Sequence, residues 1–368
     1  NLSGYSTIAN GTTQSGGGTT RQVTPSDNWC SILASTQAGQ EVIFTPGNYS
    51  TTCSINISGT ASAPILIRSE SETNRATFNY PGSSSNILEV YGSYLTFRGF
   101  AFRPNSDSVD AIRIMGGVRN VIVERNRFEG TANIMISANS GNTQDLIIRD
   151  NTLINLLNTP VYIGTHDGSS SSQNLLFERN FIDGVNPPDP AIGYGIEVKL
   201  NSSATIRDNT VYRTKGPPIM VYGSNNGSPA SIVEGNYTEG SSNEGGIVVG
   251  GGPAIVRNNV AVGNGYGGIS VQNYGGRNLI QNIQIVHNTL INNFDSGINL
   301  QSWNSSTNVL AYNAILPRSG TSAIRPIPTT GINVGNFTCS AACFVNAITA
   351  PYDLWPSNIG ALLNQAGS

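Results

Sequence analysis

The sequence predicts an all-β solenoid: a single-stranded right-handed parallel β-helix with a short N-terminal capping helix. One pattern, an apolar strand followed by a terminal Asn, recurs eight times with spacings of 25, 29, 29, 27, 23, 29 and 25 residues. A period in this range with short β-rich units is typical of a solenoid. Within each repeat the apolar residues alternate, which indicates strands. The repeats end at Asn126, Asn151, Asn180, Asn209, Asn236, Asn259, Asn288 and Asn313.

A second apolar segment occurs in every repeat, as at 195–199 and 218–222. The connections are too short for crossover helices, so parallel strands can stack only if the whole chain winds as a coil. Successive turns then lie about 4.8 Å apart, and eight turns predict a cylinder of roughly 38 Å. The terminal Asn residues suit turns and can hydrogen-bond to one another as a ladder. We therefore interpret them as structural.

The N-terminal segment 26–49 is interpreted as a short helix followed by a strand, with Ser26 or Asp27 as N-cap and Gly39 at the helix end. Such a helix would cover the strand edges of the first turn. Segments 57–70 and 93–104 resemble early, imperfect turns.

The repeat is lost after Pro317, which predicts irregular C-terminal capping turns over 318–368. Because a solenoid grows without splitting into domains, the whole chain 1–368 is predicted as one β-helix domain, with 26–60 forming the N-terminal cap and first coil.

Composition narrows the classes of function. The net charge is −3 and no basic stripe is present, so a nucleic-acid partner is not expected. No run of 18 apolar residues exists, so no membrane span is expected. No signal peptide is visible, which suits a mature form. Nine Asn-x-Ser/Thr sequons permit glycosylation without requiring it.

Four cysteines lie in the two terminal regions. A Cys30–Cys53 disulfide would pin the cap helix to the first coil, and a Cys339–Cys343 disulfide would close a small loop. The alternative, a zinc site, lacks nearby His residues and a CxxC pair. Two disulfides predict a secreted, extracellular protein.

Side chains alternate along a strand, so the residues between the apolar ones of the second segment point outward. Lys199 is expected between Gly164 and Tyr222, and Glu197 between Tyr162 and Met220. One outward column is expected to run Arg113, Met135, Tyr162, Glu197, Met220, Val248, Ser270 and Asn299. The next is expected to run Met115, Ser137, Gly164, Lys199, Tyr222, Gly250, Gln272 and Gln301.

Lysine and histidine are scarce in this chain, which draws attention to the one region that contains both. The chain has only two Lys and two His, and one of each, Lys199 and His166, falls close to Glu197 on this face. The polar and aromatic residues nearby suit sugar rings. The predicted substrate-binding residues are Asn201, Gln272, Tyr274, Gln301 and Trp303.

The chain resembles right-handed parallel β-helix proteins that process uronate polysaccharides, both in the Gly59–Ile67 segment (GTxxxPIxI) and in the Asn that ends each coil. The segment 195–211 (GIEVKLNSSATIRDNTV) is similar to the catalytic strand of the alginate lyase and chondroitinase B family. The resemblance implies that Lys199 is the base and Glu197 a Ca²⁺ ligand. That family places an acidic pair before the lysine and an arginine on the next coil. Here Glu197 stands alone, and Tyr222 takes the place of the arginine.

Cleaving a 4-linked uronate by β-elimination needs a base for the C5 proton, a group that neutralises the carboxylate, and an acid for the leaving oxygen. Lys199 or His166 can serve as the base, and Tyr222 or Tyr162 as the acid. Asn201, Gln272 or a cation on Glu197 could hold the carboxylate. A bare Glu197 stabilises the ammonium form of a nearby lysine. Without a metal, His166 with a tyrosine is therefore the better base.

The leading prediction is a secreted lyase that acts on an acidic polysaccharide, and three alternatives stay open. A C5-epimerase uses the same proton abstraction, and residues 161–168 (VYIGTHDG) resemble the tyrosine–histidine site of mannuronan epimerases. A hydrolase needs two carboxylates facing one bond, and the outward columns offer only Glu197. A non-catalytic carbohydrate-binding, adhesive or filament-forming protein needs none of this chemistry.

Overall fold

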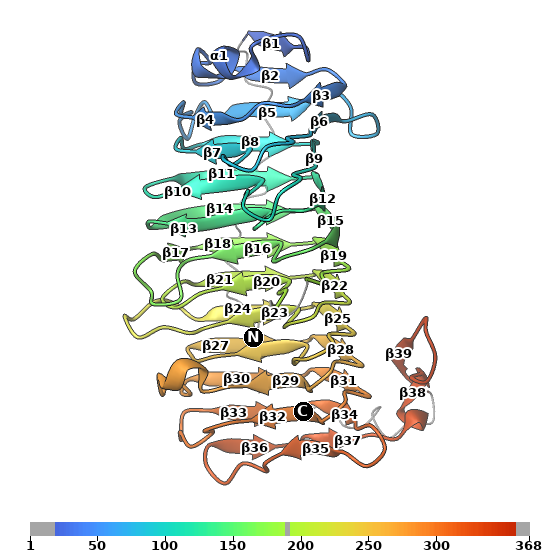
Figure 1. The fold of residues 1–368 in the computed structure, drawn as a ribbon. Helices are drawn as coiled ribbons and strands as arrows, with labels where there is room; N and C mark the ends of the chain where they lie inside the picture. Colours follow the sequence, from blue (N-terminus) through green and yellow to red (C-terminus); the bar gives the residue numbers. More distant parts are fainter. Residues whose placement is uncertain (1–18, 188–191, 358–368) are drawn as a thin grey trace.

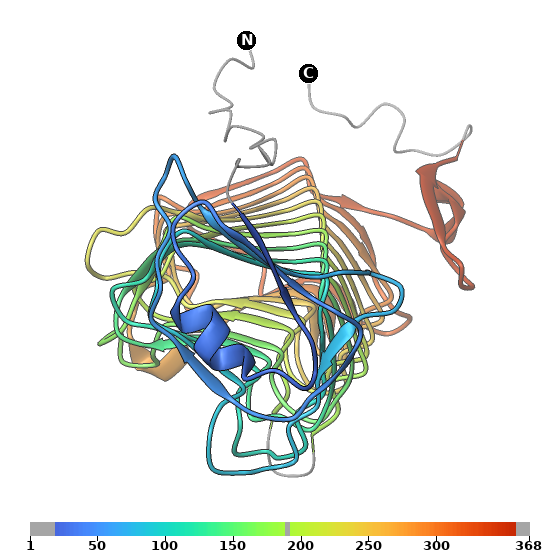
Figure 2. The ribbon, with the colours of Figure 1, turned by 90° about the horizontal axis from the view of Figure 1, so that it is seen from above.

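The predicted right-handed parallel β-helix is confirmed. The structure, a computed structural model, describes residues 19–187 and 192–357 and winds them into a coil with three parallel sheets along one axis (Figure 1). Each turn passes through sheet A, then sheet B, then sheet C, and the turns lie on one another when seen along the axis (Figure 2).

The strands of sheet A, in chain order, are β1 (Thr20–Val23), β2 (Glu41–Phe44), β5 (Ile65–Ser69), β8 (Leu95–Arg98), β11 (Arg119–Glu124), β14 (Thr143–Arg149), β17 (Ser172–Gln173), β18 (Leu175–Glu178), β21 (Ala204–Arg207), β24 (Ser231–Glu234), β27 (Ala254–Arg257), β30 (Ile283–Val286), β33 (Val309–Ala311) and β36 (Ile332–Val334). Those of sheet B are β3 (Gly47–Tyr49), β6 (Ala76–Phe78), β9 (Ala101–Phe102), β12 (Arg127–Gly130), β15 (Thr152–Leu156), β19 (Phe181–Asp183), β22 (Thr210–Tyr212), β25 (Tyr237–Glu239), β28 (Val260–Val262), β31 (Thr289–Ile291), β34 (Ala314–Leu316) and β37 (Phe337–Thr338). Those of sheet C are β4 (Cys53–Ile55), β7 (Leu88–Val90), β10 (Ile112–Met115), β13 (Ile136–Ser140), β16 (Val161–Ile163), β20 (Ile196–Val198), β23 (Ile219–Val221), β26 (Ile247–Val249), β29 (Gly267–Val271), β32 (Ser296–Leu300) and β35 (Ser322–Arg325).

Sheet B was not predicted, because the sequence pattern showed only two strand segments in each turn. Its strands follow the terminal Asn directly and are mostly two to five residues long, as in β19 and β22. Segments this short carry one or two apolar residues, too few to establish an alternation.

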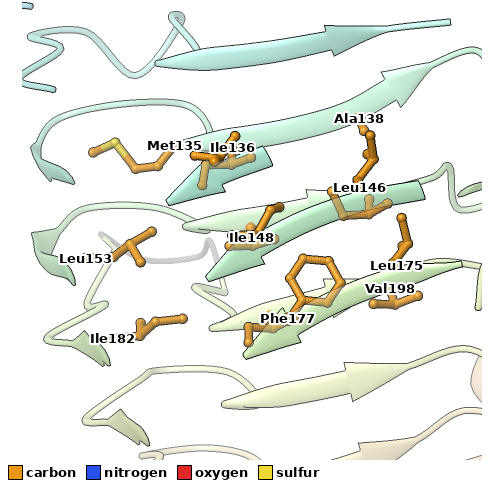
Figure 3. Packing of buried hydrophobic residues seen from close by; sticks show 14 of the residues in the cluster. Met135, Ile136, Ala138, Leu146, Ile148, Leu153, Leu175, Phe177, Ile182 and Val198 are labelled. Atoms are coloured by element: carbon orange, nitrogen blue, oxygen red, sulfur yellow. The ribbon is translucent and has the colours of Figure 1, made fainter. Parts of the chain in front are cut away.

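The inward side chains of the three sheets form one continuous apolar core. Figure 3 shows Ile148 and Phe177 of sheet A, Leu153 of sheet B and Val198 of sheet C meeting inside the coil. Met135 is also in this core, with 2 % of its surface exposed, so its predicted place in the outward column is wrong. Ser137 takes that place, because β13 pairs Ser137 with both Arg113 and Tyr162.

The predicted Asn ladder is confirmed at the corner between sheets A and B, and it continues to Asn336. Asn180 Nδ2 donates to Asn209 Oδ1 at 2.9 Å, and the backbone N–H of Asn180 donates to the same oxygen at 3.0 Å. The equivalent bonds recur in the next turn, and Asn209 is only 1 % exposed. Each amide therefore satisfies buried groups of its neighbouring turn.

We predict that Asn209→Ala destabilises the coil by about 1–3 kcal/mol, because it leaves two buried donors of Asn180 without their acceptor. Urea unfolding followed by circular dichroism measures the change. Asn74→Ala is the matched control, since Asn74 is exposed in a turn. Equal unfolding free energies of the two variants would show that the Asn ladder does not stabilise the coil.

The N-terminal cap is the predicted helix, α1 (Trp29–Ala34), which lies across the first turn (Figure 2). Its N-cap is Asn28 rather than Ser26 or Asp27, since the Asn28 side chain accepts from the Ser31 N–H. The predicted Cys30–Cys53 disulfide joins α1 to β4.

At the other end the coil stays regular beyond Pro317, contrary to the expected irregular turns. Strands β35, β36 and β37 add another turn, and the residues after it fold as η2 (Ala341–Cys343) and an antiparallel hairpin, β38 (Phe344–Asn346) and β39 (Asp353–Pro356). This segment packs on the outer face of sheet B, where Phe344 joins a cluster with Val262 and Ile291.

The predicted Cys339–Cys343 disulfide is absent: both thiols are free and buried. They act as apolar packing groups of the cluster beneath the hairpin, and burial raises the pKa of the Cys339 thiol. The turn between them is already closed by the Cys343 N–H, which donates to the Ser340 carbonyl at 3.0 Å. None of the helices in the described part of the chain is long and apolar enough to span a membrane.

Candidate functional site

The strand register places the predicted residues as neighbours on the outer face of sheet C. Glu197 pairs with Tyr162 on one side and Met220 on the other. Lys199 N–H donates to the Ile163 carbonyl at 2.8 Å, and Tyr222 N–H donates to the Val198 carbonyl at 3.0 Å. Lys199 therefore stands between Gly164 and Tyr222, as predicted.

Lys199, Glu197 and Tyr222 form one hydrogen-bonded group. The Lys199 ammonium donates to Glu197 Oε1 and, at 2.8 Å, to the Tyr222 hydroxyl. That hydroxyl donates to Glu197 Oε1 at 2.7 Å. Lys199 Nζ also lies 4.3 Å from the ring centre of Tyr222 and 4.5 Å from that of Tyr162, within the range of cation–π attraction. The ammonium is thus held by a carboxylate and by aromatic faces.

This group is buried, whereas an open shelf was expected. The side chain of Lys199 is 6 % exposed and that of Glu197 is 1 % exposed. Tyr194 and Tyr274 pack over the cluster that contains Tyr222. Both covering residues come from loops, whose course cannot be read from the alternation of strand residues.

The burial of Lys199 and Glu197 bears on whether Lys199 can act as a catalytic base. Burial raises the pKa of the Glu197 carboxyl, while the Lys199 charge and hydrogen bond oppose that rise. The Lys199 side chain is enclosed by a carboxylate, a hydroxyl and aromatic rings, so this geometry favours a structural charge over an amine that reaches a substrate.

We predict that Lys199→Met destabilises the protein by about 3–5 kcal/mol, because it leaves the Glu197 carboxylate buried without its partner. The double variant Glu197→Gln/Lys199→Met should recover most of that loss, since it removes both charges. Chemical denaturation of the two variants and the wild type measures the effect. An unfolding free energy that is unchanged in Lys199→Met would contradict the buried pair.

The accessible face of the site is made by His166. This residue is exposed on the turn after β16, and its ring centre lies 5.6 Å from that of Tyr274 and 6.3 Å from that of Tyr222. Asp167 stabilises the turn by accepting from the Ser169 N–H and hydroxyl. Tyr274 begins η1 (Tyr274–Gly276), which follows β29 and projects from the same edge of the coil four turns farther along (Figure 1).

Arg277 is the residue that the sequence did not single out. Its guanidinium donates to the His166 carbonyl at 2.7 Å and lies 5.7 Å from the ring centre of Tyr274. Among the described residues it makes no ion pair with a carboxylate. His166 and Arg277 are 111 positions apart, so only the winding of the coil brings them together.

The surroundings of His166 favour its neutral form. Burial, followed by the positive charges of Arg277 and Lys199, lowers the pKa of His166 below its ordinary 6.5. The nearby phenol of Tyr162 stays protonated, because burial and the Glu197 carboxylate raise its pKa to about 12. The site therefore combines a neutral imidazole, a protonated phenol and an unpaired guanidinium.

The predicted substrate-binding residues separate into different groups. Asn201 is 9 % exposed and supports loops, because its Oδ1 accepts from the Asn225 N–H at 3.0 Å. Gln272 donates to Glu244 Oε2 at 3.0 Å, and Gln301 is exposed farther along the column. The prediction for Trp303 is wrong: the residue is 8 % exposed and packs in the core, so its ring cannot stack on a sugar.

Glu197 does not fit the Ca²⁺ site that the sequence suggested. Its Oε1 accepts from a lysine ammonium and a tyrosine hydroxyl, and a cation would be repelled by that ammonium. In residues 19–187 and 192–357 no group of three or more His, Cys, Asp or Glu side chains is placed to hold a metal ion.

Comparisons with known proteins agree with the fold. The family model for a right handed beta helix region matches residues 169–336. A mannuronic acid specific polysaccharide family 6 lyase from human gut microbiota is similar in structure, with 13 % identity, 83 % of this chain and 82 % of that chain covered, and a TM-score of 0.50. The Dettilon tailspike protein gives 14 % identity, 87 % and 66 % coverage and a TM-score of 0.51. The A-module of an Azotobacter vinelandii mannuronan C-5 epimerase gives 14 % identity, 84 % and 93 % coverage and a TM-score of 0.47.

A search of curated protein sequences gives no match. The predicted resemblance to right-handed β-helix polysaccharide lyases is therefore confirmed for the fold, and at these identities it extends no further.

Proposed function

We propose that the protein cleaves a uronate-containing polysaccharide by β-elimination at the face formed by His166, Tyr162 and Arg277. The observation that carries the proposal is the contact between Arg277 and the His166 turn, which sets an unpaired guanidinium beside a neutral, exposed imidazole. The fold likeness to a mannuronic acid specific lyase makes a polymer of mannuronic acid the first substrate to test.

Each group has a role in this reaction. Arg277 binds the uronate carboxylate, which makes the C5 proton more acidic. His166 accepts that proton, the C4–O bond breaks, and the electron pair forms the C4–C5 double bond. Tyr162, whose ring centre lies 4.5 Å from the Lys199 ammonium, donates its proton to the leaving oxygen.

Lys199 is accordingly a positioning residue in this proposal. Its fixed charge lies beneath the site and lowers the pKa of His166 together with Arg277. Glu197 and Tyr222 hold that charge in place. This arrangement satisfies the need for a cation near the reaction without a bound metal.

The proposal is tested by incubating the protein with alginate, glucuronan, pectate and glycosaminoglycans and following the ultraviolet absorbance of the unsaturated product. A C5-epimerase would instead exchange the C5 proton with solvent deuterium without forming a double bond. A binding protein would do neither while still retaining the polymer. Absence of unsaturated product on every acidic polymer would overturn the lyase proposal.

The pH dependence follows from the lowered pKa of His166. The base must be neutral, so kcat/KM should be at its full value above pH 6.5 and should fall as the pH drops through the lowered pKa. A pH–rate profile on the active polymer measures this acid limb. A limb centred above the ordinary pKa of 6.5 would contradict the assigned environment of His166.

A further inference from the structure

A hollow lies along the same edge of the coil as His166, toward the N-terminus. It has a volume of about 690 Å³ and is lined by the corners between sheets C and A in four successive turns. Tyr94, Arg119, Asn142 and Gln144 supply its larger side chains. Neither the sequence pattern nor the proposed reaction uses these residues.

Arg119 and Tyr94 repeat the arrangement of Arg277 and Tyr274. The Arg119 guanidinium lies 5.8 Å from the ring centre of Tyr94, and the Arg119 side chain is exposed. It makes no ion pair with a described residue, whereas Arg98 on the neighbouring strand is paired with Glu124 at 2.5 Å. The unpaired guanidinium is therefore available for an external anion.

The backbone displays these two side chains firmly. Tyr94 has a left-handed backbone with φ of 58°, and its N–H donates to the Arg119 carbonyl at 3.1 Å. The Arg119 N–H in turn donates to the Ser93 hydroxyl at 3.1 Å. Non-glycine residues rarely adopt a positive φ, and these bonds hold the backbone from which the Tyr94 ring and the Arg119 guanidinium project side by side.

The amides on the opposite wall add polar groups and connect this hollow to the His166 turn. Asn142 Oδ1 accepts from the Ser171 N–H at 2.9 Å, and the Ser170 hydroxyl accepts from the Gly141 N–H at 2.9 Å. Ser170 and Ser171 directly follow the turn that carries His166. Arg119 lies two turns before that turn, which is roughly 10 Å along the axis.

We infer that this hollow is a binding site for a second acidic sugar unit of the same polymer chain. The guanidinium suits a carboxylate in a bidentate pair, the Tyr94 face suits the apolar face of a pyranose ring, and the amides suit hydroxyl groups. The polysaccharide would then lie along the corner, parallel to the axis, and contact Arg119 and Arg277 at once. The inference rests on the proposed function for the class of polymer.

Titration calorimetry with mannuronate oligosaccharides of increasing length tests the inference, using full-length His166→Gln protein so that no cleavage occurs. In this parent the affinity should rise with length until the oligosaccharide spans the His166 face and the hollow. Adding Arg119→Gln should lower the affinity for the long oligosaccharides by about tenfold and remove the gain with length. Arg119→Lys should give an intermediate loss, because it keeps the charge without the planar fork.

Arg103→Gln is the matched control, since it removes another exposed arginine, one that is paired with Glu129 on sheet B. It should leave the affinity unchanged. Equal affinity of the Arg119→Gln variant and its parent for long oligosaccharides would overturn the second site and leave the proposed function standing. A parent that binds no oligouronate of any length would overturn the proposed function itself, and the second site with it.

Discussion

His166→Gln is expected to lower kcat/KM on the active polyuronate by at least about 100-fold, because a positioned base contributes roughly 10²–10⁴-fold to proton transfer. Glutamine keeps a similar size and polarity but cannot accept the C5 proton. The side chain is exposed, so the substitution should leave the fold intact. The rate of formation of the unsaturated product measures the effect.

The chain contains a matched control for this variant. His287 is the only other histidine, and it stacks on Tyr312 at a ring-centre distance of 5.4 Å in a left-handed turn position before Asn288. His287→Gln should retain wild-type kcat/KM. If both variants kept full activity, His166 would not be the base.

Arg277→Gln is expected to lower kcat/KM by about 10²–10³-fold, since it removes the group that stabilises the charge developing on the uronate carboxylate. It should also shift the acid limb of the pH–rate profile upward. The Arg277 charge lowers the pKa of His166, so its removal raises that pKa and protonates the base at a higher pH. A purely structural role for Arg277 would lower the rate without moving the limb.

Arg318→Gln is the control for charge and exposure. Arg318 is exposed and lies 4.0 Å from the ring centre of Phe294, near the C-terminal end of the coil. Its substitution should change neither the rate nor the position of the acid limb. Arg277→Lys should recover part of the rate, because an ammonium restores the charge but not the bidentate geometry.

The sequence predicted the coil because the recurring Asn residues show the length of each turn directly. The alternation in segments such as 120–126 assigned the inward residues of sheet A, and the terminal Asn marked the corner where the ladder forms. The same counting placed Lys199 between Gly164 and Tyr222. It failed at β13, where the register pairs Arg113 with Ser137 rather than with Met135.

The parts that could not be predicted depend on loops rather than strands. Tyr194 and Tyr274 cover the Lys199 group, and nothing in their local sequence shows that they fold over sheet C. Arg277 reaches the His166 turn across 111 residues, a contact that exists only once the coil is wound. Trp303 was expected to bind substrate because it follows Gln301 of the outward column, but its side chain packs in the core.

The most direct test of the account is mass spectrometry of the products formed from polymannuronate in deuterated water. The account predicts oligosaccharides with an unsaturated uronate at the non-reducing end, produced by the wild type and not by His166→Gln. Products with saturated ends, formed by addition of water, would show hydrolysis and contradict an elimination that begins with removal of the C5 proton.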